Sequence, residues 1–359
     1  MSTLLTRLFP TPSSLLIPST GLDFSDATLR FVELQEREHG IVPTRYEETP
    51  IPAGLLQGGR IVDDKGFTKF LMEVKEKFKL KYVRVAIPES QIYSFTLPLD
   101  LAAGANIKSA IELVLEDNIP LKAVETIFDY HILLQNEKNI VVQVFAISET
   151  VSRAYFTCFS QAGLVPISFE LDGQAIARAV LPRTYKGSCM IVDFGAGRTS
   201  MSIVTQGTTV YTSTLDFGGR NMTETLAKEL HISFEEAQEL KHEYGIASAR
   251  DNKGVYSVLM GGVSTLKDEI NRRYVYWHEK KNQYGGVFPN IDTIYLCGGH
   301  SNLKGLADYL SVSLKLKVIQ ANPWVNCLSF DDIIPVMPQE VSMSYVTAIG
   351  LVLGDYLYE

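Results

Sequence analysis

A glycine-rich turn between two short apolar segments constrains this chain more than any other feature. Residues 190–192 are apolar and predict a buried strand, and residues 199–204 alternate polar and apolar side chains as a second strand does. Asp193 ends the first strand, and Gly195 and Gly197 follow in the turn. Glycine lets backbone N–H groups converge on an anion, and a carboxylate at the root of the turn can hold magnesium through water. An ordinary tight hairpin gives the same pattern, so one turn leaves both interpretations open.

The same pattern occurs a second time near the N-terminus. A short segment reaches Asp23 and Phe24, turns through small residues, and continues as an alternating strand to Glu33. Two such hairpins, 170 positions apart, indicate a duplicated core. Further glycine turns follow at 216–219 and 296–299. Four turns of this kind can close on one nucleotide from two sides.

Length and charge limit the classes of protein to consider. A chain of 359 residues is long enough for several subdomains with ample core, and its net charge of −8 argues against non-specific nucleic-acid binding as a main role. No apolar run approaches the ~20 residues of a membrane-spanning helix, and the first twenty residues make a poor signal peptide. The apolar pattern there suits a membrane or a partner, but we expect residues 1–19 to form a flexible tail; its apolar members are Leu4, Leu5, Leu8 and Phe9.

The cysteines and histidines suggest no catalytic or metal centre. The cysteines lie in apolar stretches without close pairing, which predicts buried free thiols in a reducing compartment; they are Cys158, Cys189, Cys297 and Cys327. The histidines form no metal-binding motif. His300 follows Gly299, but one histidine beside a glycine turn is more often incidental.

The remaining chain alternates helical and strand patterns, which predicts an α/β fold. Residues 35–66 are polar and punctuated by turns, so we expect only strand fragments there. Residues 90–148 look like an inserted small module with one helix and three strands. Amphipathic or apolar spacing predicts helices over 67–78, 107–115, 151–162, 174–180, 221–230, 233–245, 255–277, 303–314 and 345–353. Strands are predicted over 81–87, 91–97, 128–134, 140–147, 165–170, 208–215, 291–297 and 317–320.

Seven short motifs follow one another in a fixed order along the chain: Glu116–Pro120, Val192–Thr199, Phe217–Thr223, Ser233–Lys241, Asp268–Arg272, Tyr295–Leu306 and Ala348–Gly350. This ordered set resembles that of the PilM family of type IV pilus assembly proteins, which are actin-like ATPases related to the cell-division protein FtsA. The resemblance covers nearly everything from residue 20 onward.

This resemblance implies an actin-like ATPase fold of the ribonuclease H-like type, with two lobes, duplicated mixed-sheet cores and an inserted α+β module. Residues 20–87 with 149–186 would form the first core subdomain, and residues 88–148 the partner-binding insert. Residues 187–225 with 289–359 would form the second core subdomain. Residues 226–288 would be a helical, nucleotide-clamping subdomain.

The resemblance also implies the site residues. ATP and Mg²⁺ would bind between the lobes, with Asp23 and Asp193 holding the metal through water. The other cofactor-binding positions would be Ser25, Gly195, Gly197, Thr199, Gly218, Gly219, Gln238, Lys241, Gly298 and Gly299. Asp172 falls where related ATPases place the acid that orients the attacking water, and Glu170 is a nearby rival.

The first turn departs from the family pattern, which begins Asp-x-Gly. Ser25 occupies the glycine position, and Asp26 adds a carboxylate where small or hydroxyl residues are usual. Two unit charges ~4 Å apart at an effective dielectric of ~20 repel by roughly 4 kcal/mol, so Asp26 should disfavour a nearby terminal phosphate. Gln238 also replaces the glutamate expected before Lys241. We expect ATP binding with slow or absent hydrolysis, unless the first turn is a plain hairpin that no longer meets phosphate.

The implied function is that of a cytoplasmic assembly factor at the inner face of the cytoplasmic membrane. It would bind the cytoplasmic tail of a PilN-like inner-membrane protein and other pilus assembly proteins, in a type IV pilus or related secretion machine, with nucleotide as a conformational switch. It would bind no nucleic acid, would reach the membrane only through partners, and can form a homo-oligomer. The alternatives are a nucleotide-free actin-like scaffold and a small-molecule kinase of the same superfamily.

The insert offers candidate residues for partner binding. Its apolar residues Ile111, Leu115, Ile119 and Phe128, rimmed by Glu116, Asp117 and Glu125, would suit a short apolar tail with basic flanks. Ile111 and Leu115 can equally serve to pack the insert itself.

Overall fold

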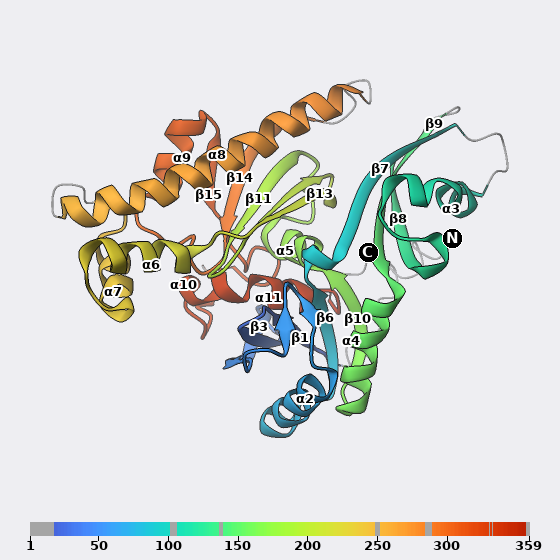
Figure 1. Cartoon of the computed structure of the whole chain (residues 1–359), viewed down its shortest axis with the longest axis horizontal. Coiled ribbons are helices and arrows are strands. Elements are labelled where there is room, and N and C mark those ends of the chain that lie inside the picture. The colour runs from blue at the N-terminus through green and yellow to red at the C-terminus, as the bar shows by residue number, and fades with distance from the viewer. Residues whose placement is uncertain are drawn as a thin grey trace.

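The computed structural model describes residues 18–100, 106–135, 139–247, 252–283, 289–329, 331 and 333–356. All but the last two residues of the predicted tail, with its apolar pattern, lie outside the described residues. Figure 1 shows two sheets with their helices joined through a shared helical layer, and a smaller module attached at one side.

The first lobe is a five-stranded sheet with strand order β10-β6-β1-β2-β3. Its strands are β1 (Thr20–Phe24), β2 (Thr28–Arg37), β3 (Gly40–Pro50), β6 (Tyr82–Ile87) and β10 (Val165–Leu171). Helices α2 (Asp64–Phe78) and α4 (Glu149–Gln161) cover one face, where Phe67, Phe159 and Tyr155 pack with Leu22 and Phe31. Strand β3 falls in the stretch where we expected only fragments, and a short hairpin of β4 (Leu56–Gln57) and β5 (Arg60–Ile61) follows it.

The second lobe repeats this sheet with strand order β13-β12-β11-β14-β15. Its strands are β11 (Ser188–Phe194), β12 (Thr199–Thr205), β13 (Thr208–Leu215), β14 (Ile291–Cys297) and β15 (Lys317–Gln320). In each lobe an antiparallel three-strand meander starts from the central strand, and two parallel strands extend the other side. The duplicated core predicted from the two hairpins is therefore confirmed.

Helices form the layers around and between the sheets. The outer face of the second sheet is covered by α6 (Gly219–Leu230), α7 (Phe234–Tyr244), α8 (Lys253–Gln283) and α9 (Leu306–Leu314). A capping box of Ser233 and Glu236 opens α7. Helices α5 (Asp172–Val180) and α11 (Val346–Leu353) lie between the lobes, and their apolar residues share one core with Val32 of β2 and Ile191 of β11. The short α10 (Gln339–Ser342) and a turn at Met343–Tyr345 lead into α11.

The inserted module is a three-stranded sheet of order β7-β9-β8 with one covering helix. It comprises β7 (Ile92–Asp100), α3 (Ile107–Asn118), β8 (Thr126–Gln135) and β9 (Asn139–Ser148), with short 3₁₀ turns at Glu89–Gln91 and Ala123–Glu125. Ile111, Leu115 and Ile119 are buried between α3 and this sheet. Their assignment as partner anchors is therefore wrong, because they form the core of the insert.

The prediction of buried free thiols is confirmed for all four cysteines. In the described part of the chain, no helix combines the length and apolar character needed to cross a membrane.

Candidate functional site

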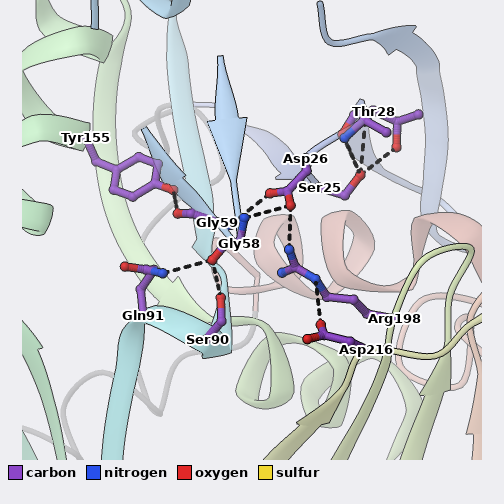
Figure 2. A network of polar contacts seen from close by, with 11 residues as sticks. Ser25, Asp26, Thr28, Gly58, Gly59, Ser90, Gln91, Tyr155, Arg198 and Asp216 are labelled. Atoms are coloured by element: carbon purple, nitrogen blue, oxygen red, sulfur yellow. Dashed lines mark hydrogen bonds and ion pairs between the residues drawn. The ribbon is translucent and has the colours of Figure 1, made fainter. Parts of the chain in front are cut away.

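The two hairpin turns contact each other where the two lobes meet (Figure 2), a region called the cleft below. Asp26, in the turn after β1, contacts Arg198, in the turn after β11, with 2.6 Å between Oδ2 and Nη2 (Figure 2). The strands position these turns because β1 and β11 are the central strands of their sheets and end at the same side of the fold. Both halves of the duplicated core therefore contribute side chains to the cleft.

Four carboxyl groups gather at the strand ends that border the cleft. Burial, opposed by Arg30, raises the pKa of Asp23, and burial with the charge of Asp23 raises the pKa of Asp193 to about 7. Burial, together with the neighbouring carboxylates, also raises the pKa of Asp172 well above its usual value. The fourth member, Glu89, has a pKa raised to about 8, chiefly by burial. Such shifts show that negative charge is poorly compensated at this point.

Of the two rival acids, Asp172 lies at this cluster and Glu170 does not belong to it. Glu170 is held by two arginines, with 3.1 Å to Arg84 and 2.8 Å to Arg178. Asp172 begins α5, and its buried Oδ1 has no hydrogen-bond partner among the described residues. Glu170 is thus engaged by two guanidinium groups, and of the two acids only Asp172 lies near the other three carboxyl groups.

Glu89 is the member of this cluster that the sequence reasoning missed. It follows Pro88 at the end of β6, and it accepts hydrogen bonds from Ser202 (3.2 Å) and Thr214 (3.4 Å) of the second lobe. Its position in the sequence could have predicted it. Glu89 follows the buried strand β6 as Asp172 follows β10, and parallel strands end at the same edge of a sheet. No motif marks it.

The carboxyl cluster fits a magnesium ion that is held through water. Among the described residues, no three His, Cys, Asp or Glu side chains are arranged to ligate a metal directly. The orphaned Oδ1 of Asp172 and the raised pKa values of Asp23 and Asp193 are what a hydrated cation would relieve. Magnesium, when bound, supplies a counter-charge for these carboxylates and for phosphate.

The second glycine turn packs directly on the N-terminus of α6. The N–H groups of Gly219 and Arg220 donate to the carbonyls of Gly195 (3.0 Å) and Ala196 (2.8 Å). A Cβ on Gly218 would lie 2.4 Å from the Ala196 carbonyl oxygen, so only glycine permits this approach. The helix amides that would meet a phosphate are therefore bonded to the protein itself.

The pocket beside this turn is also filled by protein. It is lined by Phe194, Met222, Lys241, His242, Gly299, His300 and Leu303, and its volume of about 10 Å³ has room for about one water molecule. A Cβ on Gly219 would lie 1.7 Å from the His300 ring, so this ring covers Gly219. Burial, with the charge of Lys241, lowers the pKa of His300 to about 3 and keeps the ring neutral.

Of the remaining predicted residues, Lys241 lines this pocket, whereas Thr199 and Gln238 do not. Lys241 is buried, and its Nζ donates to the Gly219 carbonyl (2.9 Å) and to Thr223 Oγ1 (2.5 Å). Burial lowers the pKa of Lys241 to about 8. Thr199 Oγ1 donates to the Phe217 carbonyl at 2.6 Å, while Gln238 lies exposed on α7 and does not line the pocket.

Gly298 and Gly299 follow β14 at the root of the second turn. Gly298 has a φ of +85°, and a Cβ there would lie 2.3 Å from Asp193 Oδ1. Gly299 lines the pocket, and a Cβ there would lie 2.4 Å from Ser344 Oγ. Both glycines therefore permit close packing of the chain on itself.

Asp26 does not act as an isolated charge. Besides Arg198, it accepts hydrogen bonds from the N–H groups of Gly58 and Gly59, each at 2.8 Å. The repulsion of phosphate expected from Asp26 is thus offset by a cation and two backbone dipoles.

A second and larger concavity lies between the insert and the first lobe. It has a volume of about 430 Å³ and is bordered by β8 and β10, the edge strands of their sheets. Its apolar lining is Ile87, Ile92, Ile127, Phe128, Phe145, Ala146, Ile147, Phe169 and Leu171, and its polar lining is Asp129, His131, Ser168, Glu170, Gln174 and Arg178. We call this concavity the groove. Of the partner residues expected in the insert, Phe128 lines it, whereas the acids Glu116, Asp117 and Glu125 do not.

The curated relatives that the chain resembles include the cell division protein FtsA of two organisms. It is 32% identical to the cell division protein FtsA of Neisseria meningitidis over 100 residues, which are 27% of this chain and 24% of that protein. It is 20% identical to FtsA of Staphylococcus epidermidis over 172 residues, 43% of this chain and 37% of that one. The matched parts thus span only about a quarter to two fifths of those relatives.

Solved structures match over more of the chain. One is a PilM-PilN type IV pilus biogenesis complex, with 21% identity, a TM-score of 0.76, and coverage of 95% of this chain and 99% of that one. Another is MreB 5 of Spiroplasma citri bound to AMPPNP, with 14% identity, a TM-score of 0.55, and coverage of 94% and 96%. These likenesses establish the actin-like ATPase fold. Since the model of the family described as type IV pilus assembly protein PilM matches residues 21–356, the chain belongs to that family.

Proposed function

We propose that this chain is an assembly factor of a type IV pilus or a related secretion machine, and that its groove docks the cytoplasmic tail of a PilN-like inner-membrane protein. The groove is the observation that carries this proposal. It is the larger of the two concavities described above, with about 430 Å³ against about 10 Å³ in the pocket beside the second glycine turn. A soluble body that holds such a tail would sit at the inner face of the cytoplasmic membrane through its partner.

The walls of the groove suit an extended apolar segment. Ile127 of β8 lines the groove and is 47% exposed, although it is aliphatic, and Phe169 and Leu171 of β10 add apolar surface on the opposite wall. Both strands are sheet edges, so their outer backbone groups can pair with an added strand. The polar wall carries Asp129 and His131 of β8 and the ion pair of Arg178 with Glu170.

The test is binding of a labelled synthetic peptide with the N-terminal sequence of the PilN-like protein, measured by fluorescence anisotropy. Ile127→Asp, in the groove, should weaken binding at least tenfold, because it places a charge against an apolar segment. Val124→Asp is the matched control, since Val124 is 84% exposed on the same insert but does not line the groove. Equal affinities of the two variants would place the docking surface elsewhere.

We further propose that ATP with magnesium binds in the cleft and acts as a switch with slow or absent hydrolysis. The carboxyl cluster and the glycine turns support this proposal. Because the α6 amides are bonded to the second turn and His300 covers Gly219, nucleotide binding requires the turn to separate from α6. Nucleotide would thus select a more open arrangement of the cleft.

Calorimetry of Mg·ATP binding tests this second part. His300→Ala should tighten binding about tenfold by removing the ring from Gly219, and Asp193→Asn should weaken it by removing a charge that faces magnesium. His39→Ala, in the exposed turn between β2 and β3, is the control. Absence of ATP binding in both the native protein and His300→Ala would favour the nucleotide-free scaffold, for which the filled pocket is the specific support.

A further inference from the structure

Asp26 is the centre of a polar network that joins three parts of the molecule. Its carboxylate accepts from Arg198 of the second lobe at 2.6 Å and from the Gly58 and Gly59 N–H groups of the first lobe at 2.8 Å (Figure 2). Arg198 also lies 3.7 Å from Asp216, which is almost fully exposed. Asp26 is therefore the point at which an ion pair between the lobes meets the short β4–β5 turn.

The other side of that turn contacts the insert. The Gly58 carbonyl accepts from Ser90 Oγ (2.7 Å) and Gln91 Nε2 (2.8 Å). Both glycines have positive φ, 61° at Gly58 and 74° at Gly59, and a Cβ on Gly59 would lie 2.6 Å from Pro88. The turn thus uses its N–H groups for Asp26 and its carbonyls for the chain that enters the insert.

The chain that leaves the insert reaches the same turn. Tyr155 of α4 donates its hydroxyl hydrogen to the Gly59 carbonyl, and α4 starts directly after β9. Ser90 and Gln91, on the opposite connection, lie directly before β7. Both crossings between the first lobe and the insert are therefore hydrogen-bonded to two adjacent peptide groups.

We propose that Arg198, Asp26 and the Gly58–Gly59 turn form a latch that transmits the relative position of the lobes to the root of the insert, and so to the width of the groove. Ile92, the first residue of β7, and Ile87, the last of β6, lie in the groove wall on either side of the latched segment. A shift of the second lobe that moves Arg198 pulls on Asp26, then on the turn, and then on both connections of the insert. The part that concerns the groove rests on the proposed docking function.

The ion pair between Arg198 and Asp26 can break and form again at low cost. Arg198 and Asp26 are 28% and 33% exposed, so water can replace either partner without leaving a buried charge. Arg198 belongs to the second glycine turn, whose carbonyls cap α6. When that turn separates from α6, the cation that holds Asp26 moves with it. The network therefore supplies a physical connection between the cleft and the groove.

Hydrogen exchange of the whole chain without ligand tests the latch. Arg198→Gln removes the cation from the second lobe, and we expect peptides covering 55–61, in the first lobe, and 88–92, at the entry to the insert, to exchange at least threefold faster. Arg198→Lys keeps a charge at the position and should restore much of the protection. Arg272→Gln is the matched control, because Arg272 is a second-lobe arginine whose ion-pair partner, Glu269, lies on its own helix. A change confined to residues near 198 would overturn the proposal.

Peptide binding then tests the consequence for the groove. The affinity of the PilN-like tail peptide should change at least threefold in Arg198→Gln and should stay unchanged in Arg272→Gln. Binding to the native protein with no effect of Arg198→Gln would overturn the link to the groove and leave the docking function standing. No binding to the native protein would instead overturn the docking function, while the exchange experiment still decides whether the lobes are latched to the insert.

Discussion

The two hairpins that border the cleft share a backbone and differ in chemistry. Asp23 pairs with Arg30 and Asp193 with Ser200 at equivalent places, and each turn is closed by the same bond, from Ser25 N–H to the Thr28 carbonyl (2.8 Å) or from Gly195 N–H to the Arg198 carbonyl (3.0 Å). In the first turn, however, Ser25 Oγ accepts from the Ala27 and Thr28 N–H groups at 3.3 and 3.1 Å.

This difference shows how a duplicated element can take on two tasks. The first turn satisfies its own amides and presents a carboxylate, Asp26, whereas the second presents a cation, Arg198, and packs its carbonyls on α6. Strand register is fixed by sheet pairing and buried side chains, so it survives in both halves. Turn residues face the cleft, so they can diverge without loss of the fold.

The largest effect is expected where the second hairpin meets its neighbouring strand. Gly298 has a φ of +85°, and a Cβ there would lie 2.6 Å from the Phe194 carbonyl oxygen. Gly298→Ala should therefore lower the free energy of unfolding by about 3 kcal/mol, measured by urea denaturation. The first lobe has Pro88 directly after the corresponding strand β6, so only the second hairpin depends on glycine at this place.

Gly197→Ala is the control for that measurement. A Cβ at Gly197 meets no atom within 4 Å, so this change should alter stability by less than about 0.5 kcal/mol. A similar loss in both variants would mean that the second hairpin is sensitive throughout, and not at its root alone.

The next effect concerns the pH dependence of stability. Burial raises the pKa of Asp193 to about 7 from an unfolded value of 3.8, so the folded state holds an extra proton between these pH values. The associated stabilisation is fully present below pH 3.8 and is lost progressively as the pH rises to about 7. Asp193→Asn cannot ionise, so without magnesium we expect its stability relative to the native protein to increase by roughly 2 kcal/mol between pH 5 and pH 8.

Urea denaturation at pH 5, 6, 7 and 8 measures this difference, and Asp26→Asn serves as the contrast. Asp26 already accepts from a guanidinium and two amides, so its replacement should destabilise the protein at pH 8 and not stabilise it. If Asp193→Asn were less stable than the native protein at pH 8, the carboxyl cluster would have a compensating cation that the described contacts do not include.

The sequence predicted the fold well where the signal was local. The apolar stripe of α2 and the alternation of β13 gave elements close to those observed. Strand β3 was expected only as fragments because its residues are mainly polar and half-exposed, so pairing with β2, and not side-chain pattern, decides its length. Ile111 and Leu115 were misassigned because an apolar stripe does not specify whether its own sheet or a partner covers it.

The cleft was predictable only in part for a similar reason. Asp23 and Asp193 were predicted because the same Asp-Phe hairpin pattern occurs at both positions. Glu89 and the His300 ring are brought there by tertiary packing, and the Asp-Phe pattern is absent from their segments. The roles of the nucleotide-binding positions stay predictions, and the pairing of Asp26 with Arg198 had no signal in either turn alone.

The smallest effect should come from converting the first turn toward the second. Ser25 is exposed, and its hydroxyl bonds only within its own turn, so Ser25→Gly should lower the free energy of unfolding by less than about 1 kcal/mol. The change frees the Ala27 and Thr28 amides and removes a side chain, while Asp26 and the latch are retained. If this turn faces phosphate, Mg·ATP affinity measured by calorimetry should rise about threefold.

Ser25→Ala separates the two causes, since it frees the amides but keeps the Cβ. A rise in both variants would assign the effect to the amides, a rise in Ser25→Gly alone would assign it to close backbone approach, and unchanged affinity in both would show that only the second hairpin meets the nucleotide.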